Sequence, residues 1–169
     1  MESSCTTKPP EASAPVRCPS CDRPGRKVDR ITVKALLRSG ALARLSTPEH
    51  RFCPGAECPV VYFGNGEVFE RPDLTVPVFQ KEAPGHRTVC YCFAISEDDL
   101  RLEIVATGRS TAAERITSLV NADRCACEVR NPQGSCCLGN VAAAINAAKE
   151  VAESDGEPLA LSEETPRHD

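Results

Sequence analysis

Residues 90–100 read CYCFAISEDDL and residues 125–137 read CACEVRNPQGSCC, and these two stretches decide the fold of the chain. They carry six of its eleven cysteines, and the segment between them has a helical pattern. Thiolates hold iron in a tetrahedral field of sulfur, and four of them complete a 2Fe-2S unit. The arrangement predicts an iron-sulfur site built from two cysteine-bearing turns that a helical hairpin brings together.

Three short helices are expected around these cysteines. Ser96 starts the first as a hydroxyl N-cap, acidic residues follow in its first turn, and Gly108 ends it. Thr111 starts the second, with Glu114 completing a capping box. The third runs over the alanine-rich stretch 140–153. Cysteines just before helices lie among free amide groups, which favour the negative charge of a cluster.

A second set of cysteines lies upstream. Cys18-Pro-Ser-Cys21 is a C-x-x-C turn, and Cys53-Pro-Gly-Ala-Glu-Cys58 has a spacing that also lets two sulfurs converge. Four thiolates at about 2.3 Å make a closed, four-coordinate zinc site. We therefore expect these four cysteines to bind zinc. His50 is an alternative ligand, disfavoured because four sulfurs are already available nearby.

The fold class indicated is α+β, with a small zinc-bound β-rich domain over residues 16–82 and a small helical 2Fe-2S domain over 83–153. Apolar and β-branched residues on both sides of Gly64-Asn65-Gly66 predict a β-hairpin, and residues 74–78 suit a third strand. Residues 1–15 lack an apolar period and are expected to be a disordered tail, and residues 154–169 an acidic tail.

Composition narrows the classes of function. The net charge of −4 argues against a nucleic-acid partner bound through a basic surface. No apolar segment approaches the roughly 20 residues that span a bilayer, and the first residues are not a secretory signal. We therefore expect a cytoplasmic protein without a membrane segment, whose reduced cysteines bind metal rather than form a disulfide framework.

The stretch from Cys90 to Leu100 resembles the opening of bacterioferritin-associated ferredoxin type domains. In that family a C-x-C followed by a Ser-started helix supplies two ligands to a 2Fe-2S cluster, and a C-x-x-C before a later helix supplies the other two. Here the second half departs from the pattern, because Cys125-Ala-Cys127 and Cys136-Cys137 replace the C-x-x-C.

Together with the upstream pairs, this departure makes residues 16 to about 153 similar to the N-terminal region of CopZ-type copper chaperones. The resemblance implies a redox-active metallochaperone or electron-transfer protein in the homeostasis of copper or another soft metal, whose cluster reduces Cu(II) to Cu(I). It also implies a redox partner and a copper-transporting ATPase or copper-carrier domain acting in trans. The copper-carrying domain with an M-x-C-x-x-C loop, found in full-length members, is not seen in this sequence.

Carried over residue by residue, the resemblance gives two ligand sets and no catalytic residue. The zinc ligands are Cys18, Cys21, Cys53 and Cys58. The first two cluster ligands are Cys90 and Cys92, and Cys137, next to the third helix, takes the place of the last ligand. We choose Cys127 as the partner of Cys137. Cys125 and Cys136 are then spare thiols that can bind an incoming Cu(I) or replace a cluster ligand.

Two other classes of function stay open. In one, all the ordered cysteines hold zinc and the protein is an interaction scaffold. In the other, Cys136 and Cys137 carry out thiol-based reductase chemistry, because a disulfide between adjacent cysteines is strained and easily reduced.

Overall fold

The computed structural model of the chain describes residues 16–155. Its strands are β1 (Arg26–Val28), β2 (His50–Phe52), β3 (Val60–Gly64), β4 (Glu67–Glu70), β5 (Thr88–Cys90) and β6 (Ile95–Ser96). Its helices are α1 (Arg30–Leu36), α2 (Ser39–Leu42), α3 (Glu97–Thr107), α4 (Ala112–Asn121), α5 (Cys127–Arg130) and α6 (Leu138–Asp155), with 3-10 turns η1 (Arg71–Asp73) and η2 (Phe79–Lys81). The tails expected at residues 1–15 and 154–169 lie outside the described residues, except for the last two residues of α6.

Strands β1 to β4 form one antiparallel sheet in the order β1-β2-β3-β4, and with α1, α2 and η1 they make up what we call the β-rich part. Its core is aromatic, with Phe52, Tyr62 and Phe69 almost completely buried. The predicted hairpin is confirmed as β3 and β4. Its turn contains Gly66 at φ 86°, a conformation that favours glycine.

The strand predicted over residues 74–78 is wrong. Leu74 forms only an isolated bridge with Leu37, and the amide of Thr75 donates to the carbonyl oxygen of Leu36. This segment therefore closes over the end of α1 instead of pairing with β4. Its apolar pattern reflects burial, because Leu74 and Val78 are 2% and 1% exposed.

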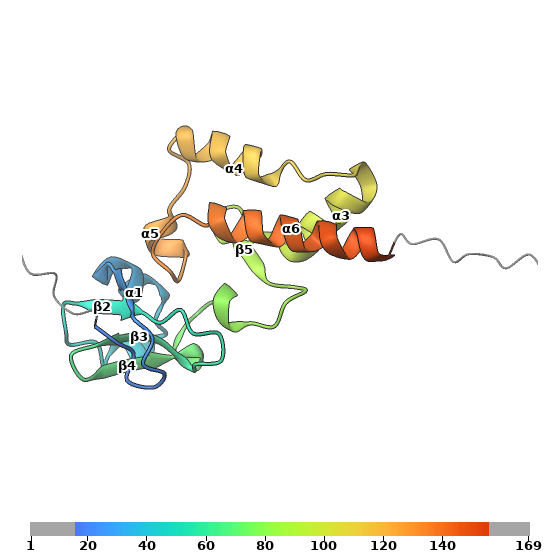
Figure 1. The fold of residues 1–169 in the computed structure, drawn as a ribbon. Helices are drawn as coiled ribbons and strands as arrows, with labels where there is room; N and C mark the ends of the chain where they lie inside the picture. Colours follow the sequence, from blue (N-terminus) through green and yellow to red (C-terminus); the bar gives the residue numbers. More distant parts are fainter. Residues whose placement is uncertain (1–15, 156–169) are drawn as a thin grey trace, which may run out of the picture.

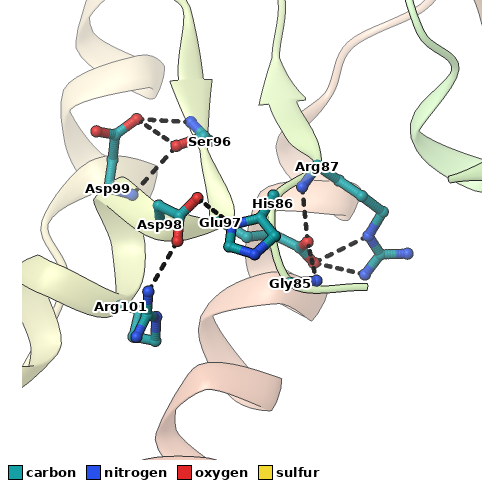
Figure 2. Close-up of polar contacts among 8 residues, drawn as sticks. All are labelled: Gly85, His86, Arg87, Ser96, Glu97, Asp98, Asp99 and Arg101. Atoms are coloured by element: carbon teal, nitrogen blue, oxygen red, sulfur yellow. Dashed lines mark hydrogen bonds and ion pairs between the residues drawn. The ribbon is translucent and has the colours of Figure 1, made fainter. Parts of the chain in front are cut away.

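The β5–β6 ribbon and helices α3, α4, α5 and α6 make up the helical part, whose core contains Val89, Leu100, Ile116 and Val141. The α+β class is confirmed. The first predicted helix is also confirmed as α3, because Ser96 Oγ accepts from the Asp99 amide and its C-cap is a left-handed glycine. Figure 2 shows this cap, with the Asp99 carboxylate returning to the Ser96 amide and hydroxyl.

Helix α4 begins as predicted after Thr111, but the cap is different. Glu103 of α3 accepts hydrogen bonds from the amide and hydroxyl of Thr111 and from the hydroxyl of Ser110, so Glu114 has no part in it. The cap ties α4 to α3. The spacing of residues at the start of α4 could not predict this cap, because the capping carboxylate belongs to another helix.

The two parts meet where α5 packs against α1, as Figure 1 shows below the start of α6. Helix α5 was not anticipated from the sequence. It begins at one of the predicted cluster ligands, Cys127, and so places the second group of cysteines at the boundary of the two parts.

Candidate metal centres

The four upstream cysteines form a compact quartet. The Sγ atoms of Cys18, Cys21, Cys53 and Cys58 all lie within 4.8 Å of one another. The Cys18–Cys58 separation is 3.8 Å and the Cys21–Cys53 separation is 3.5 Å. A tetrahedron of thiolates with 2.3 Å bonds has edges of about 3.8 Å. The quartet therefore fits one tetrahedral ion such as zinc.

Local backbone geometry brings these sulfurs together. The first pair lies on a turn in which Asp22 adopts a left-handed φ of 57° and donates its amide to the carbonyl of Cys18. The second pair lies on the connection between β2 and β3. A Cβ at Gly55 would lie 3.1 Å from Cys58 Cβ and 3.3 Å from Cys21 Sγ, which is tighter than most Cβ contacts, so the close approach of the turns favours a residue without a side chain.

The thiols of the quartet differ in pKa. Burial raises the pKa of Cys53 to about 12. For Cys58 burial also acts upward, but hydrogen bonds from the Val60 amide and from Ser20 outweigh it and lower the pKa to about 7. A metal ion must therefore displace protons from the buried thiols, which couples metal binding to pH.

Lys81, the last residue of η2, is a buried lysine beside the quartet that the sequence did not single out. It is 4% exposed, and its Nζ donates to the carbonyl oxygens of Gly55 and Cys58 at 2.7 and 3.0 Å. Four thiolates around a divalent cation have a net charge of about −2. A buried ammonium beside the thiolates offsets part of this negative charge. The local sequence around Lys81 does not show that this lysine is buried, so its role could be recognised only from the structure.

His50 does not join the quartet. It lies in β2, where its Nε2 is 3.0 Å from Glu67 Oε2 and 3.2 Å from Thr47 Oγ1. Burial alone would raise the pKa of Glu67, but hydrogen bonds from Ser46, His50 and Thr47 lower it to about 2. The histidine therefore serves a hydrogen-bonded network that ties the β2 entry to β4, and the alternative of a histidine ligand is not supported.

The downstream cysteines are arranged as two pairs. Cys92 Sγ lies 3.7 Å from Cys127 Sγ, and the thiols of Cys90 and Cys137 lie close enough for each to shift the pKa of the other. Within residues 16–155 the upstream quartet is the one group of three or more ligands gathered within 4.8 Å, so these two pairs do not merge into a second quartet. In a 2Fe-2S unit each iron is held by two cysteine thiolates, and these two sulfurs lie close together because they occupy neighbouring corners of one tetrahedron. Two close pairs fit that unit.

The pairs are assembled from three elements. Cys90 ends β5, Cys127 begins α5, and Cys137 immediately precedes α6. Cys92 lies in the turn after β5, and its sulfur accepts a hydrogen bond of 3.3 Å from the amide of Ala126. The expected amide donor for Cys92 is thus supplied by the residue just before α5, not by α3, although Cys92 is closer to α3 in sequence.

The charges of the pairs are set by mutual contact and burial. The hydrogen bond from Cys137 lowers the pKa of Cys90 to about 6, and the same bond, together with burial, raises the pKa of Cys137. Burial raises the pKa of Cys127 to about 12. Cys90 therefore loses its proton before Cys137 does. The resulting thiolate is the form that binds a metal.

The remaining cysteines of the second group are more accessible. Cys125 is half-buried and Cys136 is exposed. Both lie close enough to Cys127 for their charges to act on its pKa. Cys137, by contrast, is 2% exposed, so the adjacent pair Cys136–Cys137 does not present two accessible sulfurs as a dithiol reductase requires.

The joint between the two parts is the segment between η2 and β5, and it contains His86. Within residues 16–155 this histidine belongs to no group of three or more candidate ligands. His86 Nδ1 lies 2.6 Å from Asp98 Oδ2, and Figure 2 shows these two side chains facing each other. The imidazole is largely exposed. Beside it, Glu97 accepts from the amides of Gly85 and Arg87 and from the Arg87 guanidinium, which fixes the joint to the start of α3.

Comparisons with known proteins agree with this geometry. A family model described as a zinc binding domain of the CopZ type matches residues 15–75. The copper chaperone CopZ of Archaeoglobus fulgidus is 34% identical over 122 residues, which cover 72% of this chain and 58% of that protein. The chain therefore spans less than two thirds of the length of this curated relative.

A solved structure is also similar. The X-ray structure of the Archaeoglobus fulgidus CopZ N-terminal domain matches with a TM-score of 0.62 and 30% identity, covering 76% of this chain and 96% of that one. Among the described helices, none combines the length and apolar character needed to cross a bilayer.

Proposed function

The chain belongs to the family of the CopZ N-terminal domain, and from this premise we propose that it is a two-centre metal protein of copper homeostasis. In this proposal residues 16–82 are a zinc domain and residues 83–153 a 2Fe-2S domain. The zinc ligands are Cys18, Cys21, Cys53 and Cys58. The cluster ligands are Cys90, Cys92, Cys127 and Cys137.

One observation carries the proposal: the upstream thiols form a quartet, whereas the downstream thiols form two pairs. A single tetrahedral ion needs its sulfurs at mutual distances near about 3.8 Å. In the first set all sulfurs lie within 4.8 Å of one another, and the two separations of closest contact are 3.8 and 3.5 Å. A dinuclear unit needs close contacts only within each pair. The Cys92–Cys127 distance of 3.7 Å supports that assignment, and so does the mutual effect of Cys90 and Cys137, two thiols buried in the same core, on each other's pKa.

The second centre supplies the redox chemistry of the proposal. A 2Fe-2S cluster, when bound, exchanges single electrons, which is what the conversion of Cu(II) to Cu(I) requires. The residues of this chain hold and shield it: Cys90 and Cys137 are almost fully buried, and the Ala126 amide donates to the Cys92 sulfur. The electron must be replaced by a redox partner.

The copper ion is the cargo in this scheme. Soft thiolates favour Cu(I), and the accessible thiols nearest the cluster ligands are Cys125 and Cys136. We assign the uptake of Cu(I) to this side of the molecule. From there the ion passes to a copper-carrier domain or a copper-transporting ATPase, the partner class that the family relationship favours.

Paired serine variants test the assignment. Anaerobically purified protein should be brown and contain zinc, iron and acid-labile sulfide, and Cys127→Ser should lose iron, sulfide and colour while it keeps zinc. Cys125→Ser, two residues away, is the matched control and should keep all three. Colourless wild-type protein that contains zinc alone would favour the scaffold function and overturn the proposal.

A further inference from the structure

The 3-10 turn η2 contacts both candidate metal centres. Its last residue, Lys81, reaches the zinc side, where Nζ donates to the carbonyl oxygens of Gly55 and Cys58. Both acceptors belong to the turn that carries Cys53 and Cys58. Lys81 therefore ties η2 to the turn that carries two of the quartet's cysteines.

The middle residue of η2 reaches the loop between the distal cluster ligands. Gln80 Nε2 donates to Gln133 Oε1 at 2.5 Å, and Gln133 Nε2 donates in turn to the carbonyl oxygen of Cys136 at 2.9 Å. Gln133 is 8% exposed. The contact thus joins η2 to the backbone one residue before Cys137.

That loop is rigid inside as well. Asn131, 2% exposed, accepts from the Gln133 amide and donates its side-chain amide to the carbonyl oxygen of Ser135. The backbone amide of Asn131 donates to the carbonyl oxygen of Cys127. A displacement of Gln133 is therefore transmitted to the backbone at both Cys127 and Cys137.

The first residue of η2 reaches the proximal ligands. The Phe79 amide donates to the hydroxyl of Tyr91, which lies between Cys90 and Cys92. The Phe79 ring packs in the core that contains Cys90 and Cys137. The Arg87 guanidinium lies 4.1 Å from the centre of the same ring, and Figure 2 shows Arg87 held by Glu97 at the start of α3.

We propose that η2 is a positioning element through which the zinc-site turn holds the four thiols of the second centre in place. Three consecutive residues connect the zinc-site turn, the C-x-C turn and the distal loop. Gln80 is the positioning residue, because its one contact reaches the distal loop without touching a ligand. The identity of the second centre as a cluster rests on the proposed function, but the positioning of its thiols does not.

The test uses Gln80→Leu, which keeps the size of the side chain and removes the donor. In zinc-loaded, iron-free protein, alkylation of Cys137 followed by peptide mass spectrometry should be about fivefold faster than in wild type, the factor expected for the loss of one neutral hydrogen bond. Zinc content should be unchanged. In iron-loaded protein, release of iron to a chelator should accelerate by a similar factor.

Thr75→Val is the matched control. Thr75 Oγ1 also makes one neutral hydrogen bond, to the carbonyl oxygen of Leu36, but this bond stays within the β-rich part. The control should leave Cys137 alkylation and iron release at the wild-type rates. Gln80→Asn, which withdraws the amide by one methylene group, replaces Gln80→Leu if the latter does not fold.

The outcomes separate the two proposals. If Cys137 in the zinc-loaded Gln80 variant is alkylated at the same rate as in the wild-type protein, the positioning role is overturned, whether or not a cluster is present. Faster alkylation in a protein that never takes up iron would support the positioning role and refute the cluster.

Discussion

The hydroxyl of Tyr62 donates a hydrogen bond of 2.8 Å to the carbonyl oxygen of Pro132, and this contact joins the centre of the sheet to the loop between two candidate cluster ligands. Tyr62 is completely buried, and burial raises its pKa, so the phenol stays protonated and remains a donor. The β-rich part therefore holds the loop between Cys127 and Cys137 through Tyr62, in addition to the contact that this loop makes with η2 through Gln80.

Removal of this hydroxyl should destabilise the molecule. Tyr62→Phe leaves the Pro132 carbonyl buried without its partner, and we expect the free energy of unfolding of the zinc-loaded protein to fall by about 1–3 kcal/mol. Denaturant unfolding followed by circular dichroism measures it. Equal stability of variant and wild type would mean that water replaces the hydroxyl and that the contact carries little energy.

The same loop requires glycine at residue 134. Gly134 has φ 66°, and a Cβ there would lie 2.9 Å from Val28 Cγ2. Gly108 also has positive φ but has open space around it, so it is the matched control. Gly108→Ala should cost about 1 kcal/mol of unfolding free energy, the strain of the backbone alone. Gly134→Ala should cost more because of the clash with β1, and an equal or smaller cost would show that the loop moves away freely.

Lys81 should affect zinc retention. Lys81→Met removes the ammonium that donates to the zinc-site turn, and we expect the affinity for zinc to fall by about 10- to 100-fold, as for other groups that support metal ligands. Competition with a chromophoric chelator measures the affinity. Lys34→Met, at an exposed position on α1, should leave it unchanged. Equal affinities for the two variants would contradict the role of Lys81.

Acid should remove the contribution of Glu103. Hydrogen bonds from Thr111 and Ser110 lower its pKa from the ordinary 4.5 to about 2. Because the pKa is lower in the folded state, this carboxylate stabilises the fold above pH 4.5, and the stabilisation is lost as the pH falls toward 2. Glu103→Gln should therefore be less stable than wild type at pH 7, and the difference should disappear near pH 2.

Thermal unfolding of both proteins across this range checks the sign. Metal loss in acid affects both equally, so the difference between them isolates the carboxylate. A difference that grows as the pH falls would contradict the assignment.

Features with a local cause were predictable from the sequence. The Asn65-Gly66 turn, the Ser96 cap and the Gly108 stop each depend on a few adjacent residues, and the structure has all three. The Cys18–Cys21 and Cys53–Cys58 pairs were recognisable for the same reason, since spacing alone lets two sulfurs converge.

Features that depend on contacts far along the chain were not predictable. The cap of α4 comes from Glu103, and the amide donor to Cys92 comes from Ala126, 34 residues away. The apolar pattern at Leu74 indicated burial correctly, but it did not distinguish a strand from a segment that covers the end of α1. Lys81 was missed because burial of a charged residue has no local signature.

The most direct test of the two-centre account is electron paramagnetic resonance of the anaerobically purified protein after reduction with dithionite, together with zinc analysis of the same sample. The account predicts one zinc per chain and a signal that integrates to about one unpaired electron per chain, as a reduced 2Fe-2S cluster gives. A silent sample with about two zinc ions per chain would contradict it, because the downstream pairs would then hold a second zinc ion.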